Sequence, residues 1–303
     1  MIIIGSRGSA LALAQTEMMK RQILSRFPDE EVTIKIIKTA ADKNQTTSIR
    51  SGSSIGVFVK ELEQALLKEE VDLAVHSMKD LPTSIPAELR IAAVPEREDA
   101  RDAFISNQAD GLMELHAGSL IGTGSVRRQS QILAIRPDLK VKDIRGNVDT
   151  RLNKLQDGAY DAIILACAGL NRLGFQNRIS SPLSFEEMLP APGQGALALE
   201  ARVGDSRIAT IAVALNHPPT AIAVSAERSF LRRMGGGCNV PVAVYAHLEG
   251  NLIAIEAMAA SPDGKRIIRE SSIANTESAD DAAISLADRI LDQGGREILA
   301  EIS

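Results

Sequence analysis

The sequence predicts an α/β protein with two α/β units and a smaller C-terminal α+β unit that contains an antiparallel sheet. With 303 residues, of which 45% are hydrophobic and 24% charged, the chain is long enough for two or three domains. Over its first two thirds, short apolar runs alternate with helical patterns, as in sheets covered by helices on both faces. After the break at His217-Pro218-Pro219, two strand-like runs flank a tight turn, which is typical of antiparallel strands.

The first unit begins with a short apolar strand at Ile2 to Ile4. A turn with Arg7 and Ser9 follows, and then a helical pattern that includes Met18 and Ile23. A strand, a glycine-containing turn and a helix together direct backbone N–H groups towards an anion. Alternatively, Ser9 is an ordinary N-cap and Arg7 a solvated loop residue.

The next elements lead to a candidate ligand site. The patterns predict, in order, a strand, a polar loop, a helix and two strands, at residues 31–39, 40–54, 57–69, 71–76 and 90–94. The strand at 71–76 runs into Ser77, Lys79 and Asp80, at a strand end where open α/β sheets bind ligands. Alternatively, Asp80 is only a turn residue before Pro82.

The second unit repeats this arrangement after the charged segment 96–102, which we interpret as a domain boundary. Strands are predicted at 119–122, 139–144 and 161–166. A helix at 126–135 starts with Arg127 and Arg128, and Asn147 is the expected N-cap of a helix that carries Arg151.

Cations recur just beyond these strands, although the chain as a whole has a net charge of −5. Two arginines side by side in the first turn of a helix are unfavourable, because the helix dipole is positive there. A single arginine at such a place is more often a surface charge. The recurrence instead predicts a cleft lined for a polyanion by Arg7, Lys79, Arg127, Arg128, Arg145, Arg151 and Arg172.

The last unit carries a candidate reactive cysteine. Its helix at 220–234 is followed by Gly235, Gly236, Gly237 and Cys238, and then by strands at 241–248, 252–260 and 265–273. The three glycines leave room beside Cys238. Alternatively, this cysteine is a small buried hydrophobe. Ser278 is expected to cap a final helix, with Asp281 three residues on.

We therefore predict three domains. The segment after Gly195 is too short to be a domain, so it is expected to complete the first one. The predicted boundaries are residues 1–95 with 194–216, residues 96–193, and residues 217–303.

Composition argues against several classes of protein. Two cysteines form no disulfide framework, four scattered histidines lack zinc-site spacing, and Cys167 lies in an apolar run typical of core. A 3% aromatic content without Trp offers no stacking surface for nucleic acid. No apolar run approaches the ~20 residues of a membrane span, and none resembles a signal peptide. These features predict a cytoplasmic protein with no metal, nucleic-acid or membrane partner.

Seven motifs then carry a resemblance that reaches from the N-terminus to about Ala246. In order, they are IGSRGSALALAQ, FVKELE, AVHSMKDLPT, IGTGSVRRQSQ, DIRGNVDTRLNKL, LPAPGQGALALE and GGGCNVPVAVYA. The chain resembles the porphobilinogen deaminases, also called hydroxymethylbilane synthases.

The resemblance implies a monomeric transferase of three domains, the first two similar to periplasmic binding proteins with a cleft between them. It implies a dipyrromethane cofactor held by a thioether to Cys238, and Asp80 as the catalytic carboxylate. Four porphobilinogen molecules would be deaminated and joined head to tail on this cofactor. Hydrolysis would then release the linear tetrapyrrole.

By the same resemblance, further residues bind the carboxylates of cofactor and substrate. Each pyrrole carries an acetate and a propionate, and arginine pairs with such groups in a bidentate manner. The implied cofactor-binding residues are Ser77, Lys79, Asp80, Ser125, Arg127, Arg128 and Gly146. The implied substrate-binding residues are Arg7, Ser9, Gln15, Arg145, Arg151, Arg172 and Gln194.

The chain departs from the family pattern at two places. Ile55 replaces a lysine that commonly precedes the phenylalanine of the polar loop, and Ala100 stands where proline is usual. The first change bears on how that loop closes. Two other functions remain open at this point, a non-catalytic anion-binding protein with two lobes and a family member without activity.

Overall fold

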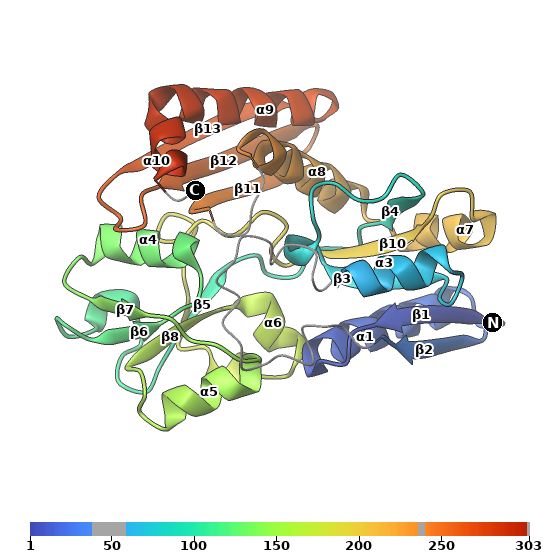
Figure 1. Ribbon diagram of the computed structural model, residues 1–303, viewed down its shortest axis with the longest axis horizontal. Helices are drawn as coiled ribbons and strands as arrows, with labels where there is room; N and C mark the ends of the chain where they lie inside the picture. Colours follow the sequence, from blue (N-terminus) through green and yellow to red (C-terminus); the bar gives the residue numbers. More distant parts are fainter. Residues whose placement is uncertain (38–58, 236–239, 302–303) are drawn as a thin grey trace. The chain divides into compact units, whose positions relative to one another are not determined.

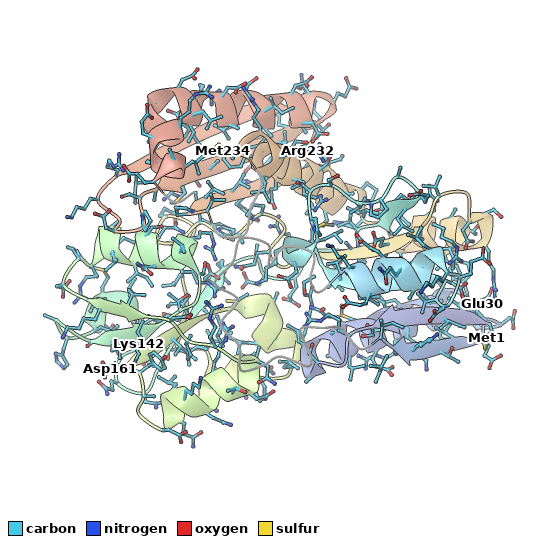
Figure 2. All side chains as sticks on the ribbon, viewed as in Figure 1. Met1, Glu30, Lys142, Asp161, Arg232 and Met234 are labelled. Carbon is cyan, nitrogen blue, oxygen red and sulfur yellow. The ribbon has the colours of Figure 1, made fainter. Side chains whose placement is uncertain are left out.

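The computed structural model describes residues 1–37, 59–235 and 240–301 (Figure 1), and Figure 2 shows side chains on the same ribbon. The chain forms two compact units. Unit 1 consists of Met1–Glu98 and Ala196–Ala221, and unit 2 of Asp99–Gly195 and Ile222–Ser303. The predictions for Cys238 and for Ile55 lie outside the described residues.

Unit 1 is built around a five-stranded sheet with the order β2-β1-β3-β10-β4. The strands are β1 (Ile2–Ser6), β2 (Val32–Ile36), β3 (Leu73–Ser77), β4 (Leu89–Ala93) and β10 (Leu197–Arg202). The helices are α1 (Ala10–Arg26), α3 (Lys60–Leu67), the 3-10 turn η1 (Met78–Asp80) and α7 (Ser206–Leu215). Apolar side chains of α1 and α7 share one core with the sheet, and those of α3 share another. The sheet is thus covered on both faces, as the sequence predicted (Figure 1).

Strand β10 completes this sheet from a distant part of the sequence. Strands β1, β2 and β3 are parallel to one another, whereas β10 runs antiparallel to both of its neighbours, β3 and β4. Its alternate residues Leu197, Leu199 and Ala201 enter the core shared with α1 and α7. The segment after Gly195 thus supplies a strand to the sheet of unit 1.

Unit 2 contains a second five-stranded sheet with the order β7-β6-β8-β5-β9. Its strands are β5 (Asp102–Ser106), β6 (Leu120–Gly122), β7 (Lys140–Lys142), β8 (Ala162–Ala166) and β9 (Ser181–Pro182). Its helical segments are η2 (Leu112–Glu114), α4 (Val126–Ile135), α5 (Val148–Gln156), α6 (Cys167–Arg172) and η3 (Gln176–Arg178). Ile132 of α4 belongs to one core, while α5 and α6 contribute to another.

The two sheets share one strand pattern. In unit 2, β6, β7 and β8 are parallel, and β5 is antiparallel to β8 and β9. Sequence analysis identified the three parallel strands but not β5, because the charged run before it was interpreted as a boundary. In each sheet, the antiparallel strand follows a segment in which the chain passes from one sheet to the other.

The C-terminal part of unit 2 forms a three-stranded antiparallel sheet, β11-β12-β13. Its elements are α8 (Pro218–Arg233), β11 (Val242–Glu249), β12 (Leu252–Ala260), β13 (Ile267–Asn275), η4 (Thr276–Ser278), α9 (Ala279–Ile290), η5 (Leu291–Gly295) and α10 (Arg296–Ala300). One core contains residues of the sheet, α8 and α9, and another places Leu189 against Ala243 and Met258. These elements confirm the predicted fold class, two α/β sheets and a smaller antiparallel one.

The start of α9 agrees with the prediction for Ser278 in position but not in bonding. Ser278 occupies the N-cap position, but its side chain makes no capping bond and its hydroxyl donates to the carbonyl of Asn275. The preceding 3-10 turn η4 supplies the entry into the helix instead, because its backbone already curls before α9 begins.

A sharp break separates α7 from α8. Pro218 and Pro219 suit the first turn of a helix, where the missing N–H groups need no partner. The side chain of Asn216, just before the break, accepts a hydrogen bond from the N–H of Val94 (2.9 Å). Within the described part of the chain, no single helix has the length and apolarity to cross a membrane, and α7 and α8 meet that test only jointly, across a bend of 101°.

Two glycines of the C-terminal sheet offer a matched test of packing within unit 2. Gly250 and Gly264 both have positive φ, at 64° and 72°. A Cβ at Gly250 would meet open space, whereas one at Gly264 would lie 2.5 Å from the carbonyl oxygen of Ser130 in α4.

We expect Gly250→Ala to lower the free energy of unfolding by about 1–2 kcal/mol, the cost of left-handed backbone with a side chain. Gly264→Ala should lower it further, by about 1–3 kcal/mol more, because backbone atoms of α4 must shift. Urea unfolding of both variants checks this, and equal losses would show that the turn and α4 do not meet in solution.

Candidate active site

The predicted residues of unit 1 gather at one edge of its sheet. Strands β1 and β3 are parallel neighbours, so their carboxyl ends lie side by side. Arg7 and Ser9 follow β1, and Lys79 and Asp80 follow β3, which ends at Ser77. The structure therefore brings these five residues to a common edge, where open α/β sheets bind ligands.

Hydrogen bonds from α1 fix this edge. The hydroxyl of Ser9 caps α1 by accepting from the N–H of Ala12 (3.3 Å), which confirms the alternative interpretation of Ser9 as an N-cap, while its implied role in substrate binding stays a prediction. Gln15 is buried and its amide bonds the hydroxyl of Ser77, with distances of 3.0 and 3.3 Å. Gln15 of α1 thus orients the hydroxyl of Ser77.

The turn η1 presents the predicted catalytic carboxylate. Met78 is buried, and its N–H donates to the carbonyl of Ala196 (3.0 Å). Its own carbonyl accepts from the N–H of Leu81 (3.2 Å). With the backbone held at Met78, Lys79 is half-buried and Asp80 is exposed.

A buried contact between a histidine and a carboxylate, which sequence analysis did not identify, lies just before this turn. His76 of β3 and Glu200 of β10 approach to 2.9 Å (Nε2 to Oε2), and both side chains are almost fully buried. Burial, together with the charge of Glu200, raises the pKa of Glu63 on α3. The face of the sheet under α3 therefore contains titratable side chains as well as apolar ones.

The predicted residues of unit 2 occupy the corresponding edge of the second sheet. Ser125 follows β6 and caps α4 by accepting from the N–H of Arg128 (3.4 Å). Asn147 follows β7 and caps α5 by accepting from the N–H of Thr150 (3.0 Å), as predicted. A Cβ at Gly124 would lie 2.9 Å from Oδ1 of Asp143, so the turns after β6 and β7 touch.

Asp102, at the start of β5, organises the two arginines of α4. Its Oδ2 accepts from Arg127 (2.8 Å) and its Oδ1 from Arg128 (2.7 and 3.1 Å). Gln194 donates to Oδ1 as well (2.8 Å), and all four residues are buried. Burial alone would raise the pKa of Asp102, but the two guanidinium groups outweigh it and hold the pKa well below its usual range.

The arginines also bind backbone. Arg127 donates to the carbonyl of Leu189, and Arg128 donates to that of Ile164 (3.0 Å). Both side chains are therefore held in place by unit 2 itself. Their implied role in cofactor binding stays a prediction, as does that of Gln194 in substrate binding.

A second group of cations surrounds the turn between β7 and α5. Arg145 is exposed and pairs with Asp143 (2.6 Å), while the Nε of Arg151 donates to the carbonyl of Gly146 (2.8 Å). Among the described residues, the terminal amino groups of Arg151 have no hydrogen-bond partner. Burial and the charges of Arg128 and Arg145 lower the pKa of Arg151. Positive charge exceeds negative charge here.

The glycine of this turn is required by its backbone. Gly146 has a φ of 116°, and a Cβ there would lie 2.7 Å from Thr150. A side chain at this position would therefore both strain the backbone and clash with α5. Arg172, at the end of α6, donates to the carbonyl of Gly195 (2.6 Å), close in sequence to Gln194.

Cys167 is a poor nucleophile in this structure. It is buried, and burial together with Asp99 and Asp102 raises its pKa to about 12. A thiol with that pKa stays protonated near neutral pH, and the thiolate is the reactive form. The prediction that Cys167 belongs to the core is confirmed.

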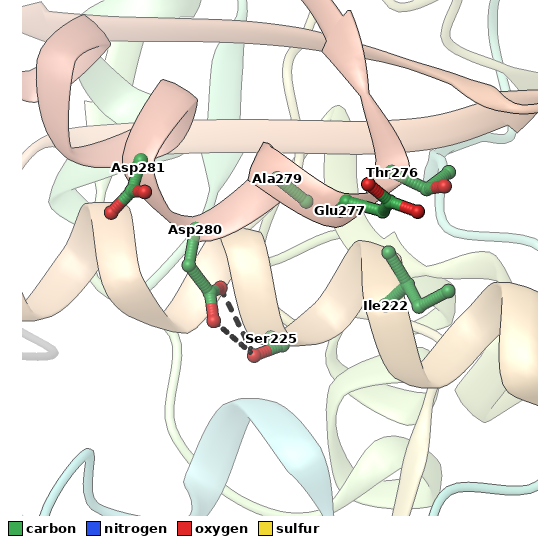
Figure 3. Close-up of a pocket in the computed structure, with 7 residues that line it drawn as sticks. All are labelled: Ile222, Ser225, Thr276, Glu277, Ala279, Asp280 and Asp281. Atoms are coloured by element: carbon green, nitrogen blue, oxygen red, sulfur yellow. Dashed lines mark hydrogen bonds between the residues drawn. The ribbon is translucent and has the colours of Figure 1, made fainter.

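A pocket of about 170 Å³, whose lining includes none of the predicted site residues, lies between α8 and the start of α9 (Figure 3). Its lining includes Glu277, Asp280 and Asp281, and Asp280 accepts from the hydroxyl of Ser225 (3.0 Å). Its charge has the wrong sign for a ligand rich in carboxylates. No group of three or more metal-ligating side chains occurs in the described part of the chain.

Replacing Asp102 by Asn should lower the free energy of unfolding at neutral pH by about 3–5 kcal/mol, because two buried cations lose their counter-charge. The depressed pKa of Asp102 means that its stabilisation is present above about pH 3.9, the usual value, and is lost as the pH falls further. Urea unfolding between pH 7 and pH 3 should thus show a difference that shrinks only at the acid end. Asp138→Asn, which breaks the exposed pair with Arg136, is the control and should cost much less.

Comparison with known proteins covers almost the whole chain. Residues 2–210 match the family model described as "Porphobilinogen deaminase, dipyromethane cofactor binding domain", and residues 221–292 match "Porphobilinogen deaminase, C-terminal domain". A porphobilinogen deaminase of Thermus thermophilus is 49% identical over 99% of both chains. One of Syntrophobacter fumaroxidans is 44% identical over 99% of this chain and 97% of its own.

Solved structures show a more distant likeness. A periplasmic substrate-binding protein of an ABC transporter from Coxiella burnetii has a TM-score of 0.45 and 13% identity, over 75% of this chain and 97% of that one. The family assignment depends instead on the sequence matches, which extend across both units. By these matches, the chain belongs to the porphobilinogen deaminase family.

Proposed function

We propose that the protein is a transferase that deaminates four porphobilinogen molecules and joins them head to tail on a dipyrromethane cofactor bound to Cys238. Hydrolysis then releases the linear tetrapyrrole. Each condensation forms one carbon–carbon bond and releases one ammonia. The structural observation that supports this most directly is the excess of positive charge around Arg145, Gly146 and Arg151.

This excess fits the chemistry of the substrate. Each added pyrrole brings two carboxylates, and Arg145 and Arg151 lie at the turn after β7 with Asp143 as the nearby acid. The Nε of Arg151 donates to the Gly146 carbonyl, which restrains the orientation of the guanidinium group. A guanidinium oriented in this way pairs with a carboxylate at little further cost in side-chain entropy.

A different set of donors is proposed for the cofactor, whose two rings carry the same carboxylates as the substrate. The donors proposed in unit 2 are Ser125, Arg127, Arg128 and Gly146, and those proposed in unit 1 are Ser77 and Lys79. When bound, the cofactor supplies the pyrrole carbon to which the first substrate is joined. The burial and raised pKa of Cys167 make it a poor anchor, which supports Cys238 in that role.

Asp80 is the proposed catalytic carboxylate. Loss of ammonia from porphobilinogen leaves an electron-poor methylene group conjugated with the pyrrole, so positive charge develops near the pyrrole N–H. A carboxylate held close to that N–H stabilises the charge. Asp80 is suited to this task because η1 fixes the backbone at Met78 and leaves the Asp80 side chain exposed.

The intact mass of the purified protein tests the cofactor proposal. We expect a mass excess of two linked pyrrole units, and peptide mapping should place it on Cys238. Cys238→Ser should lack this excess and show no activity, whereas the matched variant Cys167→Ser should keep it. An unmodified protein that stays unmodified after incubation with porphobilinogen would exclude the covalent cofactor and favour an anion-binding protein.

Replacing Asp80 by Asn tests the catalytic role. We expect kcat to fall by about two to four orders of magnitude, since the amide cannot stabilise the developing charge. The free energy of unfolding should change little, because the Asp80 side chain is exposed. Asp80→Glu, which keeps the charge, should retain more activity than Asp80→Asn. Similar rates for the Asn variant and the parent enzyme would remove Asp80 from the mechanism.

A further inference from the structure

The turn between β7 and α5 is exposed yet held by an unusual number of side chains. Of residues 143–147, only Ile144 is buried. Carbonyl groups of an exposed turn can bond to water and need no protein donor. Three carbonyls of this turn nevertheless accept hydrogen bonds from side chains outside it.

The three donors act on nearly consecutive residues. The hydroxyl of Tyr160 donates to the carbonyl of Asp143 (2.8 Å), and the ammonium of Lys154 donates to that of Arg145 (3.0 Å). The Nε of Arg151 donates to the carbonyl of Gly146 (2.8 Å). The backbone on both sides of the Arg145 side chain is thereby fixed.

Tyr160 also connects this turn to the end of the neighbouring strand. A Cβ at Gly122, the last residue of β6, would lie 2.9 Å from Cδ1 of Tyr160, so the aromatic ring packs directly on that glycine. The same side chain thus contacts the end of β6, which leads to Ser125, and the turn that carries Arg145. It sets the distance between two predicted ligand-binding segments.

Lys154 brings a further cation to this turn. It lies in the last turn of α5, where the helix dipole favours a positive charge, and three residues after Arg151, whose like charge repels it. Its ammonium donates to the carbonyl of Arg145, which water could also satisfy. A direct bond from α5, unlike a bond from water, ties the turn to the helix that follows it.

We propose that Tyr160 and Lys154 are positioning residues that hold residues 143–147 in the shape in which Arg145 and Arg151 bind substrate carboxylates. The proposal rests on the proposed function, since it identifies how that carboxylate site is kept in place. Neither residue has to touch the substrate. Both act through the backbone of the turn.

The test uses Tyr160→Phe, which removes one hydroxyl and keeps the ring on Gly122, and Lys154→Met, which removes the ammonium. For each, we expect the KM for porphobilinogen to rise about three- to tenfold with a smaller change in kcat, as for the loss of one hydrogen bond that orients a binding group. Lys154→Arg should restore a KM near that of the parent enzyme. Lys140→Met, on the exposed edge strand β7, is the control for loss of one positive charge and should leave KM unchanged.

Hydrogen–deuterium exchange gives a readout that does not depend on turnover. Amides of residues 143–149 should exchange faster in Tyr160→Phe and Lys154→Met than in the parent protein, while those of β8 should not. Unchanged KM in both variants, or unchanged exchange in this segment, would overturn the proposal. A parent protein without deaminase activity would overturn the proposed function instead, and exchange would then still decide whether the two residues hold the turn.

Discussion

The interactions of the Asp102 carboxylate hold together the edge of the unit 2 sheet at which α4 begins. It lies at the start of β5, the strand that enters the sheet antiparallel to its neighbours, and it bonds Arg127, Arg128 and Gln194. Without it, two buried cations in the first turn of α4 would oppose each other and the helix dipole. With it, a helix start that is unfavourable by itself becomes a rigid part of the sheet edge.

Stability alone does not account for such a network. A buried ion pair gains little over apolar side chains of similar volume, because removing charges from water is costly. The network does fix the direction of two guanidinium groups and leaves the cluster one positive charge in excess. Arg145 and Arg151 extend that excess beyond the buried part, at the neighbouring turn. The edge is thus arranged in two layers, an inner one neutralised in part by Asp102 and an outer one suited to carboxylates.

In unit 1, neutral groups hold the corresponding residues in place by hydrogen bonds. Gln15 holds the hydroxyl of Ser77, and the backbone of Met78 is bonded on both sides. Asp80 consequently sits on a fixed turn while its side chain stays exposed. In both units, helices and strands with ordinary cores carry short turns whose shape is set by a few hydrogen bonds. This fits a function in which charge must be presented at fixed places rather than enclosed.

The sequence by itself determined the parallel strands, the helix starts at Ser9 and Asn147, and the return of the chain after Gly195, because periodicity and capping are local properties. It also placed the cations at strand ends, and long ordered motifs indicated the family. Only the tertiary structure showed that Arg127 and Arg128 are held by Asp102, that Glu200 pairs with His76, and that Tyr160 holds Asp143. These partners are 25, 124 and 17 residues apart in the sequence, and pairing across such distances depends on strand order and register, which no local pattern encodes.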